Sequence, residues 1–347
     1  SEMCIRDRND LADSGLRYDL TLPLSRYYSN NGAQLPSPFK ALQMGSVWRA
    51  DRPQRGRFRQ FTQCDIDILG DATNMAEIEL ILATTTALGR ICPDNGFTVR
   101  INDREILKGM ALYCGFPENG LDQVFITLDK MDKIGLEGVS AELLELGYES
   151  ESVEMYTGLL AELGDDAAAV RSLGEKLSQV LPVAVTENLA SIMDTVTEVA
   201  ETDFKLAFDP TLVRGMSYYT GTIFEVSMEG FGGSVAGGGR YDKMIGKFTG
   251  QDTPACGFSI GFERIYSILM EKESYNTEKQ KKVVLIYEED QVADAIRYAE
   301  ELRKTYKTAL YIKPKKLGKF LNKLEEQGFD GFQVFGRDEE VRMFGEQ

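Results

Sequence analysis

The middle of the chain is dominated by apolar residues at helical spacing. From Met75 to Leu88 they recur every three or four residues, which is typical of a mostly buried helix. The segment from Asp103 to about Thr202 repeats this pattern and lies between two strand-rich regions. We therefore expect a helical insertion in a sheet-containing domain. Its expected helices are Glu105–Cys114, Glu142–Leu146, Glu151–Leu163, Asp166–Leu177 and Thr186–Ala200.

Apolar and polar residues alternate on both sides of this insertion, as they do along half-buried strands. A short helix is expected at Leu24–Asn30, and Gly257–Ile265 is expected to be a strand that passes into a helix. The pattern is thus that of a sheet interrupted by helices. The other expected strands are Leu16–Thr21, Phe39–Val47, Phe97–Asn102, Phe204–Asp209 and Thr222–Met228.

After a polar, charged linker at Glu271–Lys282, strands and helices alternate regularly. Such alternation predicts a small α/β domain with a parallel or mixed sheet. The expected order is Val283–Tyr287, Gln291–Tyr306, Ala309–Ile312, Leu317–Gln327 and Phe332–Phe335.

The stretch Val47–Gly70 predicts a long β-hairpin, because Arg52–Gly56 carries proline and glycine at a turn. If the second strand runs unbroken from Arg57, side chains two residues apart share one face. This face has guanidinium groups at one end and an amide and carboxylates at the other. Its residues are Arg57, Arg59, Phe61, Gln63, Asp65 and Asp67.

Two interpretations of this face are open. A solvated edge hairpin whose charges prevent edge pairing is slightly favoured by the pattern alone. However, the stretch carries arginine at positions 49, 52, 55, 57 and 59, in a chain with a net charge of -16. This concentration favours an anion site. Such a site could hold a polyphosphate at its basic end and a small molecule with N–H groups at its acidic end.

Composition narrows the class of protein. With 347 residues, 43% of them hydrophobic, the chain is long enough for two or three packed domains. No apolar run reaches membrane-spanning length and no signal-peptide core is present. The five cysteines are scattered, which favours reduced thiols in the cytoplasm and argues against zinc. Residues 1–9 lack periodicity and are interpreted as a non-native remnant.

The chain contains no histidine, so no imidazole base, triad or metal ligand can operate. Any catalysis must use other side chains. The glycine-rich run from Gly230 to Asp242 matches neither the G-x-G-x-x-G motif nor the P-loop motif of nucleotide-binding proteins. Two interpretations of this run are open: a turn whose backbone closely approaches a ligand, and a flexible hairpin loop. Arg264 is expected in the first turn of a helix. A cation at this position opposes the helix dipole, which suggests that Arg264 binds an anionic partner. The alternative is an arginine that is simply exposed to solvent.

Basic residues crowd the C-terminal α/β region. In an acidic protein this is a candidate RNA-binding surface, although solvated lysines on amphipathic helices give the same pattern. The residues are Arg303, Lys304, Lys307, Lys313, Lys315, Lys316, Lys319 and Lys323.

Several separated stretches resemble one family. W-R-A-D-R-P-Q-R-G-R-F-R-Q-F-T-Q-C-D-I-D at 48–67 resembles motif 2 of class II aminoacyl-tRNA synthetases in its histidyl form. L-V-R-G-M-S-Y-Y-T-G-T-I-F-E at 212–225 is similar to the histidyl signature. G-G-G-R-Y-D at 237–242 and G-F-S-I-G-F-E-R at 257–264 are similar to the second signature and motif 3. L-R-Y-D-L-T at 16–21 is similar to the substrate-binding strand.

The resemblance implies an α+β fold, in which helices flank a class II antiparallel sheet. It implies a catalytic domain at 10–102 and 203–272, a helical insertion at 103–202 and an anticodon-binding-like α/β domain at 282–347. The implied reaction joins L-histidine to tRNA(His) through histidyl-adenylate, with ATP as substrate, Mg²⁺ on the β- and γ-phosphates, and no bound organic cofactor or protein metal site.

The resemblance also implies roles for individual residues. Arg49, Arg214 and Arg264 would be catalytic. ATP would be bound by Arg49, Asp51, Arg57, Arg59 and Arg264. L-Histidine would be bound by Asp19, Leu20, Thr21, Arg49, Gln63, Asp67, Arg214, Tyr218, Tyr219 and Tyr241.

The chain departs from the family pattern in identifiable places. It lacks the N-terminal motif 1 segment, which builds the homodimer of the family. Asp51 and Asp67 stand where many members have glutamate. A non-catalytic regulatory subunit of ATP phosphoribosyltransferase is the alternative function, but the C-terminal module and retained arginines argue against it. A non-catalytic tRNA-binding protein is the third hypothesis.

Overall fold

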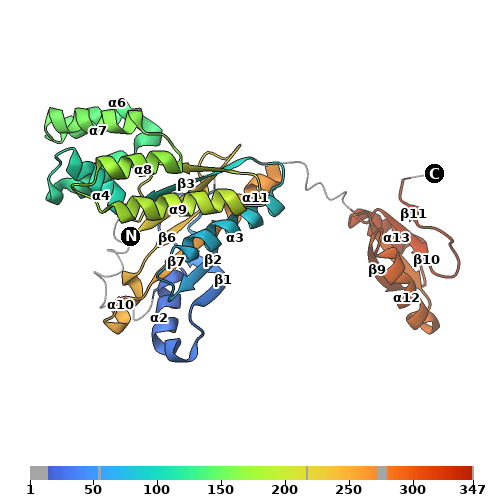
Figure 1. Ribbon diagram of the computed structural model, residues 1–347. Coiled ribbons are helices and arrows are strands. Elements are labelled where there is room, and N and C mark those ends of the chain that lie inside the picture. Colours follow the sequence, from blue (N-terminus) through green and yellow to red (C-terminus); the bar gives the residue numbers. More distant parts are fainter. Residues whose placement is uncertain (1–14, 54–55, 216–217, 272–279, 346–347) are drawn as a thin grey trace. The chain divides into compact units, whose positions relative to one another are not determined.

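The computed structural model describes residues 15–53, 56–215, 218–271 and 280–345 (Figure 1). The predicted remnant at 1–9 lies outside the described residues. The chain divides into two compact units, Ser1–Glu271 and Lys272–Gln347. We refer to them as unit 1 and unit 2.

Unit 1 is built on a seven-stranded sheet with the order β1-β2-β7-β6-β5-β3-β4. All neighbours pair antiparallel except β3 and β4, which are parallel. The predicted α+β fold with an antiparallel sheet is therefore confirmed. The strands are β1 Phe39–Trp48, β2 Gln60–Leu69, β3 Phe97–Asp103, β4 Lys205–Phe208, β5 Thr222–Met228, β6 Ser234–Arg240 and β7 Ala255–Gly261.

Helices α3 and α9 pack against this sheet and against each other, and α8 lies beside α9 (Figure 1). One continuous hydrophobic core runs from the sheet into the helices between β3 and β4. The helices of unit 1 are α2 Thr21–Asn31, α3 Met75–Ile91, α4 Arg104–Tyr113, α5 Leu121–Leu128, α6 Met131–Glu145, α7 Ser150–Glu162, α8 Ala167–Lys176, α9 Val183–Val199, α10 Lys243–Thr249 and α11 Phe262–Glu271.

Unit 2 has its own mixed sheet in the order β11-β10-β8-β9, in which β8 is parallel to both β9 and β10. Separate apolar clusters cover its two faces. The predicted alternation is confirmed, with β11 as an additional antiparallel strand. The elements are β8 Lys282–Tyr287, α12 Val292–Leu302, β9 Lys307–Ile312, α13 Leu317–Glu326, β10 Gly331–Val334 and β11 Arg342–Met343.

The strand predicted at Leu16–Thr21 is wrong. This segment is irregular, and helix α2 begins at Thr21. The Asp19 side chain accepts a hydrogen bond from the Leu22 backbone N–H at 3.0 Å, so it satisfies a donor of the first helical turn. Pro23 lies in the same turn, where its missing N–H costs nothing. The local helix start therefore replaces strand pairing.

The glycine-rich run is mainly strand rather than loop, because residues 234–240 form β6 between β5 and β7. Close packing explains its composition. A Cβ atom on Gly238 would lie 2.0 Å from the Gly257 carbonyl oxygen, and one on Gly239 would lie 2.6 Å from that of Thr222. A side chain at either position would separate the strands.

Candidate active site

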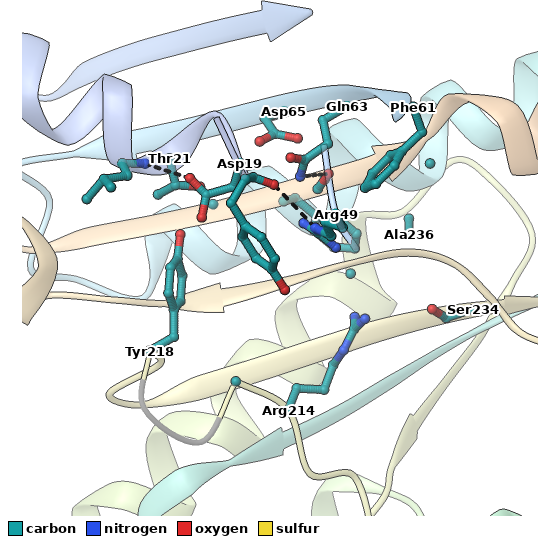
Figure 2. A pocket seen from close by; sticks show the side chains of 18 of the residues that line it. Asp19, Thr21, Arg49, Phe61, Gln63, Asp65, Arg214, Tyr218, Ser234 and Ala236 are labelled. Atoms are coloured by element: carbon teal, nitrogen blue, oxygen red, sulfur yellow. Dashed lines mark hydrogen bonds between the residues drawn. The ribbon is translucent and has the colours of Figure 1, made fainter. Parts of the chain in front are cut away.

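A cavity of about 800 Å³ opens over one face of the unit 1 sheet. Side chains from β2, β6 and β7 form its floor, and α11 and the segment before α2 contribute to its walls. Residues that are far apart in the sequence thus meet around one space (Figure 2).

The acidic end of the cavity is formed by alternate residues of β2. Gln63, Asp65 and Asp67 all line the cavity and are 8%, 3% and 3% exposed. The period-two face predicted from the sequence is confirmed for this half of the strand. Gln63 Nε2 donates to Ser259 Oγ at 3.1 Å, which turns the amide toward β7 (Figure 2).

Each of these side chains leaves an oxygen without a hydrogen-bond partner among the described residues. The atoms are Gln63 Oε1, Asp65 Oδ1 and Asp67 Oδ2. Burial raises the pKa of Asp65 to about 6 and that of Asp67 to about 7. Buried acceptors without donors are costly, so this end of the cavity is suited to a ligand rich in N–H groups.

Tyrosines surround the deepest carboxylate. The Tyr241 hydroxyl donates to Asp67 Oδ1 at 2.6 Å, and the rings of Tyr218 and Tyr219 meet edge to face at 5.0 Å. A Cβ at Gly257 would lie 2.0 Å from Asp67 Oδ1, so only glycine leaves room for this carboxylate. The result is a small aromatic pocket beside Asp67 Oδ2, which has no hydrogen bond of normal geometry among the described residues, while the nearby Gln43 amide favours the ionised carboxyl group and lowers its pKa.

Asp19 and Thr21 lie at the rim of this pocket, where the Tyr218 hydroxyl points toward them (Figure 2). The hydrogen bond from Leu22 holds Asp19 Oδ1, while the carboxylate stays beside the cavity. The early start of α2 thus places a carboxylate near the acidic end of the site.

Arg49 is held between two aromatic rings. Its guanidinium carbon lies 4.4 Å from the centroid of Tyr18 and 4.9 Å from that of Phe61. Its Nε donates to the Tyr18 carbonyl oxygen at 3.3 Å (Figure 2). Stacked arginine stays charged and keeps its remaining N–H groups available for an oxyanion.

Arg264 lies in the first turn of α11, as predicted. Its Nε donates to the Gly56 carbonyl oxygen at 3.3 Å and its Nη1 donates to Ser234. Burial, together with the nearby guanidinium groups of Arg57 and Arg214, lowers the pKa of Arg264. Clustered cations that repel one another are relieved by a bound polyanion.

Arg214 reaches the cavity from the opposite side to Arg49 (Figure 2). Its Nε pairs with Glu225 Oε2 at 3.2 Å, and its Nη1 lies 3.5 Å from the Phe224 carbonyl oxygen. A Cβ at Gly237 would lie 1.5 Å from Nη1. The side chain therefore crosses the strand at a position that only glycine leaves open.

The structure brings most of the predicted residues together, with two exceptions. The Leu20 side chain is buried beside Gly45, outside the cavity lining, and Arg59 is exposed after a bend in the chain. Arg59 misses the site because β2 begins at Gln60 and is not continuous from Arg57. The remaining predicted residues line the cavity: Asp19, Thr21, Arg49, Asp51, Arg57, Gln63, Asp67, Arg214, Tyr218, Tyr219, Tyr241 and Arg264.

Some residues of the site were not assigned a role from the sequence. Asp65 was placed by alternation on the same face as Gln63 and Asp67 but was given no role, and it lines the cavity with them. Glu225 is the one charged residue within the apolar strand β5, which is a weaker signal. Met216 and Ser217, in the predicted signature, lie outside the described residues.

Among the described helices, none has the length and apolar composition needed to cross a membrane.

The antiparallel sheet and its arginine-lined cavity define a class II aminoacyl-tRNA synthetase fold. The solved histidyl-tRNA synthetase from Nostoc sp. PCC 7120 has a TM-score of 0.72 and 27% identity, covering 91% of this chain and 74% of that one. A family model described as histidyl-tRNA synthetase matches residues 5–265. The chain belongs to the histidyl-tRNA synthetase family.

Relatives in sequence bear related names. Histidine–tRNA ligase of Leifsonia xyli subsp. xyli is 45% identical to 81% of this chain. The matched part spans 65% of the length of that relative, so the chain covers somewhat less than two thirds of it. Histidine–tRNA ligase of Christiangramia forsetii is 34% identical over 95% of this chain and 74% of the relative. A structure described as an ATP phosphoribosyltransferase regulatory subunit/histidyl-tRNA synthetase from Bacillus halodurans C is 22% identical with a TM-score of 0.69, a likeness of fold alone.

Proposed function

We propose that this protein activates L-histidine with ATP and transfers the histidyl group to tRNA(His). The observation that carries the proposal is the polarity of one cavity. Buried oxygens that have no donor among the described residues occupy one end, and guanidinium groups that repel one another occupy the other. An amino acid rich in N–H groups and a nucleoside triphosphate fit these ends together.

The first step joins the histidine carboxylate to the α-phosphorus of ATP and releases pyrophosphate. A carboxylate is already a nucleophile, so no imidazole base is needed, in keeping with the absence of histidine. Negative charge builds on the α-phosphate oxygens as the bond forms. Arg49 and Arg214, on opposite sides of the cavity, would stabilise this charge.

Arg264 and Arg57 would hold the outer phosphates at the basic end, where Asp51 also lines the cavity. Mg²⁺ would arrive on the β- and γ-phosphates as part of the substrate. The terminal ribose hydroxyl of tRNA then attacks the histidyl carbonyl, the bond to the adenylate phosphate breaks, and AMP leaves.

The amino acid would be recognised by the acidic end. Asp19, Thr21 and Gln63 would accept from the α-ammonium group. Asp67 Oδ2 would accept from the imidazole N–H, inside the pocket formed with Tyr218 and Tyr241. A ligand without that donor would leave the carboxylate unpaired, and this sets the specificity.

The activity is tested by ATP–pyrophosphate exchange with the purified chain. We expect exchange that depends on L-histidine and is absent with other amino acids of similar size. Histidine binding without exchange would contradict the proposal and favour the regulatory function. That alternative is not favoured by this structure, since Arg49, Arg214 and Arg264 all face the cavity.

Unit 2 would contact the tRNA as an anticodon-binding domain, through exposed lysines that form no ion pair with the residues that the structure describes. Lys313, Arg303 and Lys304 already pair with Glu288, Glu300 and Glu301. The basic residues that remain are exposed. Lys307 begins β9, and the other four lie around the start of α13 and along it: Lys315, Lys316, Lys319 and Lys323. Assembly as a homodimer belongs to the same proposal for the full-length protein.

Reversing two of these charges, Lys315→Glu with Lys316→Glu, should weaken tRNA binding about 10-fold or more at moderate salt, because phosphate contacts are lost. Histidine-dependent exchange should be unchanged. The matched control is Arg303→Glu with Lys304→Glu, which reverses two charges that are already paired. Equal losses in both variants, measured by filter binding, would show an effect of net charge alone and contradict a local contact.

A further inference from the structure

Glu225 lies between two arginines on strand β5. Its Oε2 is 3.2 Å from Arg214 Nε, and its Oε1 is 2.5 Å from Arg100 Nη2. The side chain is 14% exposed. Each carboxylate oxygen thus has a different guanidinium partner, and only one of those partners lines the cavity.

Arg100 is itself fixed in place. It lies directly opposite Glu225 in the β3–β5 ladder. Its Nη1 contacts Asp209 at 3.1 Å and Asp132, on helix α6, at 3.2 Å. With Arg100 held from three directions, the carboxylate of Glu225 has little freedom to rotate, and the oxygen that it offers to Arg214 is fixed.

Arg214 takes its direction mainly from this oxygen, since its other side-chain hydrogen bond among the described residues, from Nη1 to the Phe224 carbonyl oxygen, is longer at 3.5 Å. Its guanidinium crosses β6 over Gly237, and because glycine has no side chain, residue 237 gives the guanidinium no side-chain contact. The Arg214 carbonyl oxygen accepts from Arg104 Nη1 at 3.4 Å, which anchors the backbone but not the side chain. With Nε bound to Glu225, the guanidinium end of Arg214 lies at the cavity (Figure 2).

We propose that Glu225 is a positioning residue, which presents Arg214 to the reacting carboxylate and α-phosphate and is itself held by Arg100. This inference rests on the proposed histidine activation. Glutamine at position 225 keeps the shape of the side chain but removes the charge shared by both arginines. Arg214 then loses its charge-assisted hydrogen bond and is free to leave the productive orientation.

A double-mutant cycle with Glu225→Gln and Arg214→Ala tests the inference. Glu225→Gln should lower kcat of histidine-dependent exchange about 10- to 100-fold, with a small change in KM for histidine. In the Arg214→Ala background the same substitution should change kcat less than about 2-fold. Equal factors in both backgrounds, or full activity of Glu225→Gln, would overturn the inference.

Two controls separate positioning from folding. Glu229→Gln makes the same change at the exposed residue that follows β5 and should leave exchange unchanged. Arg100→Lys keeps a cation but loses the forked contacts, so it should lower kcat in the same direction as Glu225→Gln. Thermal unfolding midpoints of the variants, compared with wild type, show whether each one folds.

A readout without turnover keeps this inference distinct from the proposed function. The Nε–H signal of Arg214 in ¹⁵N NMR can be assigned by its loss in Arg214→Ala. In Glu225→Gln it should shift and exchange with water faster, because glutamine offers one neutral acceptor oxygen in place of the two charged oxygens that Arg214 and Arg100 share. An unchanged signal overturns the positioning role, whereas absence of exchange in the wild-type protein overturns the proposed function alone.

Discussion

Asp67→Asn is expected to lower kcat/KM for L-histidine about 10³- to 10⁴-fold in the exchange reaction, and also to stabilise the empty protein. Asparagine has no carboxylate that could accept a hydrogen bond from the imidazole N–H. Its NH₂ group is itself a donor and can face that N–H without a hydrogen bond. The loss should be largest in kcat/KM for histidine, with KM for ATP much less affected, because Asp67 lies at the acidic end of the cavity.

The gain in stability follows from the pKa of the buried carboxyl group. Its ordinary value is 3.8, and burial raises it to about 7 in the folded protein. Between these values the folded state binds more protons than the unfolded state. The free energy of unfolding therefore falls as pH rises through this window. Above it the folded protein carries the full cost of an ionised buried Asp67, on the order of 2–4 kcal/mol.

Urea unfolding of wild type and Asp67→Asn at pH 5 and pH 8 checks this expectation. The advantage of the asparagine variant should grow with pH. Asp71→Asn is the matched control, since a hydrogen bond from Thr73 lowers the pKa of Asp71 below 3.8, and this variant should differ from wild type by the same amount at pH 5 and pH 8. Parallel pH dependence in wild type and Asp67→Asn would show that burial does not perturb Asp67.

Gly237→Ala is expected to reduce histidine-dependent exchange about 10²- to 10³-fold, to the level of Arg214→Ala. The added Cβ would lie 1.5 Å from Arg214 Nη1 and 3.1 Å from the Phe224 carbonyl oxygen. The guanidinium must leave its position, so under the proposed function the α-phosphate would lose a donor in the transition state.

Steady-state exchange with Gly237→Ala, Arg214→Ala and the double variant checks this mechanism. If the alanine acts only by displacing Arg214, the double variant should be no worse than either single variant. Gly232→Ala is the control, because a Cβ there has no heavy atom within 4 Å. Full activity of Gly237→Ala would mean that Arg214 does not act from this position.

Local patterns were sufficient for much of the fold. Alternation placed Gln63, Asp65 and Asp67 on one face because β2 is regular there, and apolar spacing located α3 because one side of that helix is buried. Such signals need only the neighbouring residues and the existence of a core. They also located Arg264 at the start of α11.

The features that the sequence patterns did not predict have two origins: local breaks, such as the helix start at Thr21 and the bend at Arg59, and contacts between distant residues. The glycines of β6 are dictated by the Arg214 side chain and by neighbouring strands, so their sequence alone also fits a loop. The Glu225–Arg100 contact joins residues 125 positions apart. Arg59 left the predicted face because the chain bends before Gln60. None of these features has a local sequence period.

The close packing around β6 has a consequence for the variation of this protein. At positions 237, 238 and 239 the smallest possible side chain would meet a guanidinium or a backbone carbonyl oxygen. Compensation would require simultaneous changes in adjacent strands, and backbone oxygens cannot be substituted away. A single substitution at any of these three positions is therefore expected to displace Arg214 or a neighbouring strand, so this part of the cavity floor tolerates change only when several residues change together.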